Sequence, residues 1–492
     1  MTIYRYSLFL AFCIVSFGVQ AQKKNILLIV SDDLNTRIGP YLDIDKHTPN
    51  LDRLSAEGVK FTKAYCQYPV CGPSRASFMS GLYPQTNSVL SNSYKPGGYK
   101  GHNASLAHHP SLAGFFRDNG YFTARVSKIF HMGVPGDIER GTSGADDADS
   151  WDYAYNVMAP ETLSPANLEL LSPGNIHYGS NFSRMLLPDE MAPAQADYLA
   201  ASQAIAILEN RAGRIASNAR NAQKIKPDSP FFLAVGFVRP HVPFIAPKSL
   251  FDAYPEGDMS LPDTVVADNV PKLALARQNQ NIWKMNNSQK RKALSAYMAS
   301  VRFMDEQVGR ILKALDKLDI RKETIVIFLS DHGYNLGEHD CWSKVSLWEG
   351  SVRVPLIISH PDFKQTSGKE MRSVVELIDL YPTLTELCHL SEKQPGILQG
   401  KSLAGLLSGS QKDDLEYCAY TVTSGGSAAS IRTARWRYSL WGEDQVSANE
   451  ELYDHMNDPT ESTNLADDPS KLIQLKIMRK KMMDIKSKAT GH

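Results

Sequence analysis

The sequence carries no excess charge of either sign, because its 53 lysine and arginine residues are matched by 53 aspartate and glutamate residues. This balance excludes the basic electrostatic footprint of a protein that binds nucleic acid or an anionic membrane surface. Internal repeats, low-complexity tracts and coiled-coil heptads are also lacking. A chain of 492 residues can form one large domain with a smaller appendage, or two to three domains, and its ordinary composition predicts a sizeable core.

Long apolar runs are scarce, and the clearest one lies near the N-terminus, from Leu8 to Val19. It is too short to span a bilayer. With Arg5 before it and small Ala21 closing a cleavage site after it, the run is typical of a secretory signal peptide. A membrane anchor and a lipoprotein signal through Cys13 are the weaker alternatives. We therefore predict that residues 1–21 are removed and that the mature chain, without a membrane span, is exported to the periplasm or secreted.

Cysteine is rare, and one of the six, Cys13, lies in the predicted signal peptide. The mature chain keeps Cys66, Cys71, Cys341, Cys388 and Cys418. An odd number of cysteines in an exported protein leaves at least one thiol without an intrachain partner. This indicates a cysteine that is kept for chemistry rather than for cross-linking. A disulfide between Cys388 and Cys418 is a further option that the sequence does not decide.

Four segments have the nearly unbroken aliphatic and β-branched composition of strands that are buried on both faces of a parallel sheet. They are Asn25–Val30, Tyr121–Val126, Phe231–Phe237 and Thr324–Leu329. Helical patterns lie between them, at Ser111–Asn119, Tyr198–Glu209 and Ser288–Leu318. Strands that alternate with helices predict an α/β fold with a large, mostly parallel sheet flanked by helices.

Charged side chains follow directly after each of these strands. In open α/β sheets, ligands bind just beyond the carboxyl ends of the strands. We therefore expect the residues that follow the four strands to converge on one crevice. These residues are Asp32, Asp33, Lys128, His241, Asp331 and His332.

The C-terminal part of the chain has a different pattern. Short strand-like pieces occur at Arg432–Trp441 and Glu451–Tyr453, around charged turns, and Leu472–Ile485 has the pattern of an amphipathic helix. We predict a small α+β subdomain at residues 409–492, after a catalytic α/β domain at residues 22–408.

The most informative stretch is Cys71-Gly72-Pro73-Ser74-Arg75. Proline suits the first turn of a helix, and Gly81 suits its end. Cys71 would then lie at a helix N-terminus, where free amides and the helix dipole favour an anion. Arg75 lies one turn further on and can reach the same site. A lone cysteine before a helix is usually a buried structural residue, but the complete pentapeptide favours a reactive one.

The pattern Cys-x-Pro-Ser-Arg resembles the signature of the formylglycine-dependent sulfatases of the alkaline phosphatase superfamily. In that family the cysteine is oxidised after translation to formylglycine, also called 3-oxoalanine. The resemblance runs from Asn25 to about Pro469 and is closest to the iduronate-2-sulfatase subgroup. It is carried by Val30–Leu34, Ser127–His131, Arg239–Phe244, Asp331–Gly333, Gly337–His339, Ile431–Thr433, Arg437–Tyr438 and Glu451–Tyr453. It implies a sulfuric ester hydrolase with the alkaline phosphatase-like (sulfatase) fold.

The predicted metal site consists of two pairs of residues at two strand ends: Asp32 and Asp33, and Asp331 and His332. Such an oxygen-rich set suits calcium or magnesium. Asp32 and Asp33 alone could instead cap a turn or helix. His332 stands where most sulfatases have Asn or Gln, although the iduronate subgroup shares the histidine, and this nitrogen leaves the choice of ion open. The resemblance implies one divalent cation, with the formylglycine at Cys71 completing its coordination.

Four further residues take roles from the resemblance. Lys128 would bind oxygens of the formylglycine or the sulfate, and His131 would hold the hydroxyl of the hydrated aldehyde. His241 would contact the ester and protonate the leaving alcohol, because an unperturbed imidazole pKa of about 6.5 suits acid–base work. Lys344 would be a second sulfate-binding lysine and a co-acid. With Arg75, these groups would neutralise the sulfate while the hydrate attacks sulfur. A surface lysine or a structural turn histidine is the ordinary alternative at each position.

Several side chains near these segments have structural and functional interpretations. We expect His339 to brace the loop after the metal-binding strand, and His108 and His109 to be surface residues or part of a cleft rim. Three aromatic side chains could stack on a sugar ring or merely pack the loops: Tyr334, Trp342 and Trp348.

The resemblance implies a sulfated carbohydrate substrate, either a uronate-rich marine algal polysaccharide such as ulvan or a glycosaminoglycan. It also implies a maturation partner for Cys71, a formylglycine-generating enzyme or an anaerobic sulfatase-maturating enzyme. Residues Ser91–His109 and Gly136–Arg184 are the predicted specificity loops. Two other functions stay open: a phosphatase or phosphodiesterase of the same superfamily, and a non-catalytic glycan-binding protein with an unmodified Cys71. A phosphatase usually needs two metal ions and a serine or threonine nucleophile.

Overall fold

The structure is a computed structural model that describes residues 23–42, 47–159, 168–173, 181–211, 229–262, 264, 266, 269–413, 416–442 and 449–490. The predicted signal peptide, residues 1–21, lies outside these residues, as does part of the predicted specificity loop at 136–184. Among the described residues, we find no helix with the length and apolar character that crossing a membrane requires.

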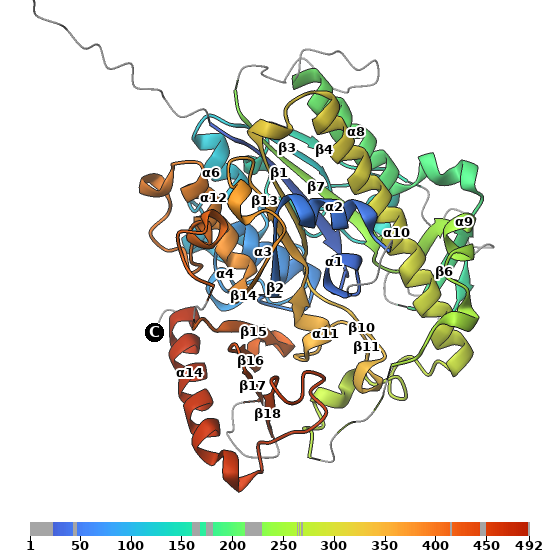
Figure 1. Cartoon of the computed structure of the whole chain (residues 1–492), viewed down its shortest axis with the longest axis vertical. Coiled ribbons are helices and arrows are strands. Elements are labelled where there is room, and N and C mark those ends of the chain that lie inside the picture. The colour runs from blue at the N-terminus through green and yellow to red at the C-terminus, as the bar shows by residue number, and fades with distance from the viewer. Residues whose placement is uncertain are drawn as a thin grey trace, which may run out of the picture.

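A large, mostly parallel sheet forms the centre of the molecule (Figure 1). Its strands, in sheet order, are β12 (Arg353–Val354), β2 (Val59–Tyr65), β13 (Leu356–Ser359), β9 (Thr324–Ser330), β1 (Asn25–Asp32), β7 (Phe231–Pro240), β3 (Phe122–Ser127) and β4 (Tyr153–Tyr155), and β14 (Lys369–Glu376) pairs with β2. The run from β9 to β4 is parallel throughout, whereas β13 and β12 run antiparallel to their neighbours. The prediction of a large, mostly parallel sheet is confirmed.

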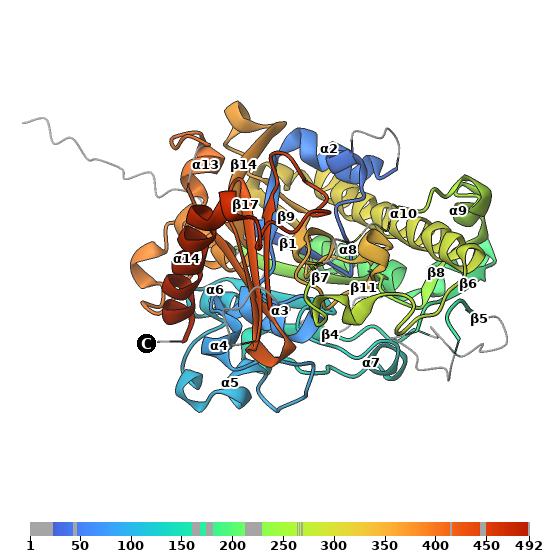
Figure 2. The ribbon, with the colours of Figure 1, turned by 90° about the horizontal axis from the view of Figure 1, so that it is seen from below.

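The central strands are apolar on both faces because helices cover both sides of the sheet. In β1, Leu27 and Ile29 face one core, and Ile26, Leu28 and Val30 face the other. The first core is closed by α2 (Pro49–Glu57), α8 (Ala196–Arg211) and α10 (Asn287–Lys317). The second is closed by α3 (Cys71–Ser80), α6 (Leu112–Asp118) and α12 (Leu380–Leu387). Figure 2 shows α2 and α10 on one side of the strands and α3 and α6 on the other.

Local capping explains where two of the predicted helices begin. Ser111 accepts a hydrogen bond from the Gly114 amide at 3.0 Å, which satisfies a free donor in the first turn of α6. Asn286 and Gln289 form a reciprocal capping box at the start of α10. The helices predicted at 111–119, 198–209 and 288–318 are therefore confirmed to within two residues at each end.

Shorter elements surround this sandwich. The helices are α1 (Gly39–Leu42), α4 (Pro84–Asn87), α5 (Tyr99–His102), α7 (Gly136–Arg140), α9 (Lys248–Asp252), α11 (Glu349–Val352) and α13 (Ala404–Ser408). A small sheet combines β5 (Glu169–Leu170), β6 (Ser183–Leu187) and β8 (Phe244–Pro247), and β10 (Asn335–Leu336) pairs with β11 (Trp342–Ser343). These short strands carry no clear periodicity and were not expected from the sequence.

A second sheet occupies the C-terminal part of the chain. It is antiparallel, in the order β15 (Ala419–Thr423), β16 (Ala428–Arg432), β17 (Trp436–Trp441) and β18 (Glu450–Asp454). The long helix α14 (Leu472–Thr490) packs Leu475, Met478 and Met482 into the core of this sheet (Figure 1). The predicted α+β composition of this region is thus present, and the exact boundary at residue 409 stays a prediction.

A buried ion-pair network joins this C-terminal sheet to the main domain. Arg437 of β17 pairs with Glu349 at the start of α11 and with Glu461. The Tyr65 hydroxyl of β2 donates to Glu349 at 2.9 Å, and His455 Nε2 lies 2.9 Å from Glu461. Burial alone would raise the pKa of Glu461, but Arg437 and His455 lower it to about 2. Both carboxylates are therefore ionised at neutral pH and depend on Arg437.

The five cysteines of the described chain are all free thiols. The disulfide considered between Cys388 and Cys418 is therefore absent from the structure. This agrees with the interpretation that cross-linking is not what the cysteines serve.

Glu376 at the end of β14 gives a testable pH dependence. Burial and the nearby charge of Asp379 raise the pKa of Glu376 to about 8, against 4.5 for an exposed glutamate. The folded state therefore holds this proton more tightly, and the resulting stabilisation is lost as the pH rises from about 4.5 through about 8. In Glu376→Gln the amide can still accept from Tyr420 N and bond the Tyr83 hydroxyl, the present partners at 2.8 and 2.9 Å.

We expect Glu376→Gln to become more stable relative to the parent protein, by about 1 kcal/mol or more, between about pH 5 and pH 8. Urea-induced unfolding at both pH values measures this difference directly. A stability difference that stays constant over this range would show that Glu376 is already ionised in the folded protein.

Candidate active site

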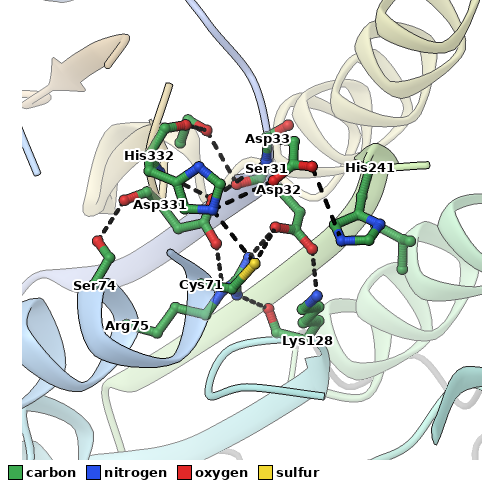
Figure 3. A network of polar contacts seen from close by, with 12 residues as sticks. Ser31, Asp32, Asp33, Cys71, Ser74, Arg75, Lys128, His241, Asp331 and His332 are labelled. Atoms are coloured by element: carbon green, nitrogen blue, oxygen red, sulfur yellow. Dashed lines mark hydrogen bonds and ion pairs between the residues drawn. The ribbon is translucent and has the colours of Figure 1, made fainter. Parts of the chain in front are cut away.

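The strand ends converge at one edge of the main sheet, as the sequence predicts. Asp32 ends β1 and Asp33 follows it, Lys128 follows β3, His241 follows β7, and Asp331 and His332 follow β9. Figure 3 shows these side chains pointing toward one another and toward Cys71 and Arg75 of α3. Together with Lys344, whose contacts are given below, the central metal and catalytic candidates lie in one cluster.

Sheet register brings these distant segments together. Ser31 of β1 lies opposite Ser330 of β9, so that the residues after them are neighbours. The Asp331 carboxylate accepts a hydrogen bond from the Asp33 amide at 3.3 Å, although the two residues are 298 positions apart. β7 also passes very close to the backbone of Lys128. Position 236 therefore requires a glycine, because a Cβ atom there would lie 1.9 Å from the carbonyl oxygen of Lys128.

Cys71 is the first residue of α3, and it is only 1% exposed. Its Sγ lies 3.2 Å from Asp32 Oδ1, 3.3 Å from His332 Nε2 and 3.2 Å from Lys344 Nζ. The helix ends at Gly81 in the left-handed conformation, with a φ of 71°. The predicted position of the cysteine at a helix N-terminus, beside acidic and basic groups, is thus observed.

Arg75 is buried and fixed by groups on two sides of the site. Its Nε donates to Asp331 Oδ2 at 2.8 Å, and its Nη1 donates to the carbonyl oxygens of Ile129, at 3.1 Å, and Lys128. Its Nη2 has no hydrogen-bond partner among the described residues and lies 3.8 Å from Asp32 Oδ1. One charged N–H group of Arg75 is therefore left to bind an anion at the site.

Four predicted metal ligands offer atoms that lie within 4.8 Å of one another: Asp32, Asp33, Cys71 and His332. The His332 Nδ1 lies 2.9 Å from the Gly333 carbonyl, which only accepts, so Nε2 faces the other ligands. Asp331 is engaged through Oδ2 by Arg75, while its Oδ1 lies 3.7 Å from His332 Nε2. The buried Oδ2 atom of Asp33 has no hydrogen-bond donor among the described residues. These donor atoms fit a divalent cation such as calcium or magnesium.

The pKa shifts show the electrostatic tension within this set. Burial raises the pKa of Asp33 to about 7 against the attraction of Lys344. Burial alone would lower the pKa of His332, but the charges of Asp331 and Cys71 raise it to about 9. Burial opposes ionisation of Asp32 as well, yet the charges of Lys128 and Arg75 hold its pKa well below the usual value. A group of acids that draws in protons in this way also attracts a metal cation.

Two lysines contact the acids: Lys128, which follows β3, and Lys344, which follows β11. Lys128 Nζ pairs with Asp32 Oδ2, and Lys344 Nζ lies 2.6 Å from Asp33 Oδ1. Burial alone would lower the pKa of Lys344, but Asp33 and Cys71 raise it well above the usual value, so this lysine stays charged.

The two catalytic histidine candidates differ from the expectation of an unperturbed pKa. Burial and Lys344 lower the pKa of His241 well below its usual value, and burial and Lys128 lower that of His131 to about 3. His241 Nδ1 lies 2.6 Å from the Val242 carbonyl, so its Nε2 is the unprotonated nitrogen and lies 3.9 Å from Asp33 Oδ2. Desolvation favours the neutral ring, so the pKa of His241 lies below the unperturbed value from which the sequence analysis argued.

The neighbouring aromatic residues pack the loops. Tyr334, Trp342 and Trp348 are at most 1% exposed, which favours the packing interpretation over sugar stacking. His339 stacks on Trp348 with ring centroids 4.1 Å apart, which fits its predicted bracing role. His108 is exposed as expected, but His109 is buried, and its Nε2 bonds the Ser80 carbonyl at 2.7 Å. The surface prediction was therefore wrong for His109.

Two residues that support the site were missed. Asn92 Oδ1 accepts from the Gly72 amide at 2.8 Å, next to Cys71. The Tyr297 hydroxyl, from the middle of α10, donates to the Asp33 carbonyl at 3.0 Å. Neither residue lies near a motif. The apolar stripe of α10 predicts that this helix packs against the sheet, but it does not predict a role for Tyr297 at the site.

The main sheet and its flanking helices form the alkaline phosphatase-like fold, which solved hydrolases share. Comparison with family models narrows the class. The model described as Sulfatase matches residues 24–390, and the model described as N-sulphoglucosamine sulphohydrolase, C-terminal, matches residues 337–488. The chain therefore belongs to the sulfatase family and is a sulfuric ester hydrolase.

Individual relatives agree with this assignment. The chain is 31% identical over 481 residues to a sulfatase of Formosa agariphila, covering 94% of this chain and 88% of the relative. It is 32% identical over 412 residues to the iduronate 2-sulfatase of Homo sapiens, covering 74% and 69%. The solved structure of a 2-O GAG sulfatase superposes with a TM-score of 0.70 at 22% identity, over 95% of this chain and 93% of that one, which shows the shared fold.

Proposed function

We propose that this sulfatase removes sulfate esters from sugar residues of a sulfated polysaccharide or its oligosaccharides. Residue Cys71 acts after conversion to formylglycine, beside one divalent cation held by Asp32, Asp33, Asp331 and His332. The observation that carries this proposal is that Cys71 Sγ lies 3.2 to 3.3 Å from two proposed metal ligands, Asp32 and His332, and from Lys344.

The residues divide the work between holding the anion and moving protons. When both are present, the modified residue 71 would supply the nucleophile, and the cation would supply positive charge for the sulfate oxygens. Arg75, Lys128 and Lys344 add fixed positive charge to a buried pocket, where it stabilises the charge on a sulfuryl group more strongly than in water. A preorganised cluster of this kind favours the transition state because it needs no rearrangement during the reaction.

The histidines present neutral nitrogen atoms to the reacting groups. His241 Nε2 can accept a proton or a hydrogen bond from the substrate side, since its Nδ1 is occupied by the Val242 carbonyl. We assign His131, whose Nδ1 is buried without a partner, to the hydroxyl group of the modified residue 71. Lys344 carries a proton that Asp33 holds in place, so we assign it the delivery of a proton to the leaving alcohol, with His241 as the alternative donor after it has gained a proton.

Two substrate classes fit the proposal. The human relative is named for iduronate 2-sulfate, and the solved neighbour is a 2-O GAG sulfatase, which supports a 2-O-sulfated uronate in a glycosaminoglycan. A uronate-rich algal polysaccharide such as ulvan is the second class. Desulfation of defined oligosaccharides from both classes, with the released position identified by NMR, distinguishes them.

The test of the activity itself pairs two measurements on one preparation. Peptide mass spectrometry reports the fraction of Cys71 converted to formylglycine, and hydrolysis of an aryl sulfate is compared with that of the matching aryl phosphate. We expect sulfate turnover in proportion to the converted fraction. Turnover with an unconverted thiol, or a preference for the phosphate, would contradict the proposal and favour the phosphatase alternative.

Metal binding should be visible in stability as well as in activity. We expect calcium added to the metal-free protein to raise the melting temperature, by the equivalent of about 2.7 kcal/mol at roughly 100 times the dissociation constant. The physical reason is that a cation relieves the repulsion among Asp32, Asp33 and Asp331. Calorimetry with calcium and with magnesium also identifies the preferred ion.

A matched pair of variants provides the control for this metal test. Asp33→Asn should abolish the calcium-dependent shift, whereas Asp362→Asn, at a surface ion pair with Lys24, should keep it. If neither calcium nor magnesium changes the melting temperature of the parent protein, the metal assignment is contradicted.

We also propose that the chain is exported after removal of residues 1–21 and that a formylglycine-generating or anaerobic sulfatase-maturating enzyme modifies Cys71. The support is the sequence pattern of the N-terminal segment and the pentapeptide at Cys71. The mass of the N-terminal peptide of the protein recovered from the native host tests the cleavage, and co-expression with either maturation enzyme tests the partner.

A further inference from the structure

The segment that carries Lys344 has an unusual backbone. Between β10 and α11, the residues His339, Asp340, Ser343 and Val345 adopt φ values of 56°, 54°, 73° and 72°. Such left-handed conformations are unfavourable for residues with a Cβ atom, and they persist only where surrounding groups hold them. Lys344 therefore keeps its contacts with Asp33 and Cys71 only if something outside the segment fixes its course.

The C-terminal sheet supplies these outside contacts. Trp348, at the end of the segment, stacks on His339, near its beginning, so one indole ring ties both ends together. Cys341, Leu347 and Trp348 share a buried apolar cluster with Ala428, Trp441 and Tyr453 of the C-terminal sheet. Figure 1 shows β10, β11 and α11 beside this sheet.

Glu451 of β18 lies at the centre of this contact and is fully buried. Its carboxylate accepts hydrogen bonds from Trp348 Nε1 at 2.9 Å, Trp441 Nε1 at 2.5 Å and the Tyr453 hydroxyl at 2.7 Å. Among the ion pairs of the described residues, none includes Glu451, and burial raises its pKa. Burying a carboxylate without a cation costs free energy of folding. If this position served apolar packing alone, an apolar residue would stabilise the protein more.

What the carboxylate provides is orientation. An indole N–H only donates, and the two indoles approach different oxygens of Glu451, so both oxygens must accept at once. This fixes the ring plane of Trp348 and, through it, the stacked His339. We propose that Glu451 is a positioning residue, which holds the Gly337–Trp348 segment so that Lys344 reaches the reacting sulfate. The inference rests on the proposed sulfatase function and extends the active site to the C-terminal sheet.

The test is a double-mutant cycle between Glu451→Gln and Lys344→Ala, measured as kcat/KM per converted residue 71. The glutamine keeps one acceptor oxygen but turns an N–H group toward one of its donor partners. We expect Glu451→Gln to lower kcat/KM by roughly 10- to 100-fold in the parent background, the size expected for a misplacement of about 1 Å. In the Lys344→Ala background it should lower kcat/KM less than about 3-fold, because the group it positions is already gone.

Glu450→Gln is the matched control, because Glu450 is also buried on β18 but pairs with Arg479 of α14 and the Tyr438 hydroxyl. It should lower the melting temperature and leave kcat/KM of the folded enzyme within about 3-fold. Equal losses from Glu451→Gln in both backgrounds, or no loss in either, would overturn the inference. Failure of the proposed function is distinguishable, since the parent protein with converted residue 71 would then show no sulfate turnover.

Discussion

Replacing Cys71 with alanine is expected to lower kcat for sulfate-ester hydrolysis by roughly four to six orders of magnitude, the loss typical of an enzyme without its nucleophile. The Sγ atom of this proposed nucleophile lies within 3.3 Å of side-chain atoms of Asp32, His332 and Lys344, at the centre of the cluster. The remaining cationic groups can still bind the substrate. The effect should therefore appear in kcat, measured under saturating substrate, with little change in KM.

Folding provides the first control for this variant. The contacts of Cys71 Sγ are with polar side chains, so Cys71→Ala should keep the circular dichroism spectrum of the parent protein and unfold at a similar temperature. Cys418→Ala, at a partly exposed thiol in the C-terminal region, should retain full activity. Substantial turnover by Cys71→Ala would mean that another residue is the nucleophile, and the assignment of the site would be wrong.

Arg437→Met is expected to lower the free energy of unfolding by about 3–5 kcal/mol, because it removes the cation that the buried Glu461 and the partly buried Glu349 share. Arg437 is 1% exposed and contacts both Glu349 and Glu461. Urea-induced unfolding at neutral pH measures the loss. The penalty should shrink as the pH falls, because Glu461 has a lowered pKa in the parent protein, and its stabilising contribution is present above about 4.5 and lost as the pH falls toward about 2.

Arg435→Met is the control variant, because Arg435 lies just before β17, the strand that carries Arg437. Arg435 also pairs with a carboxylate, Asp454, but its side chain is 44% exposed, so water replaces the lost contact and little change is expected. A similar small effect for both variants would contradict the view that the buried network couples the C-terminal sheet to the main domain.

The strand ends were predictable because they follow from two local signals. Unbroken apolar runs mark strands that are covered on both faces, and the residue after such a run must lie at the edge of the sheet. Asp32, Lys128, His241 and Asp331 could therefore be placed together without knowing the strand order. Cys71 and Arg75 needed the pentapeptide, since proline and glycine mark the helix that presents them.

The missing parts depend on packing that no local pattern encodes. The contact of Tyr297 with Asp33 depends on how α10 crosses the sheet, and that of Glu451 with Trp348 depends on how the C-terminal sheet docks. The neutral state of His241 follows from burial and from Lys344, neither of which is visible around Arg239-Pro240-His241. The burial of His109 follows from its packing against Tyr99 and Tyr381 and its contact with the Ser80 carbonyl, whereas the expectation assumed an exposed rim.

The strand order has a consequence for how the enzyme comes into being. β9 lies between β1 and β13, and it places Asp331 and His332 next to Asp32 and Asp33 at the end of β1. Until some three hundred intervening residues have been synthesised and β9 has been inserted, the growing chain holds Asp32 and Asp33 without Asp331 and His332. Sulfatase activity is therefore expected only from chains in which β9 has been inserted into the sheet.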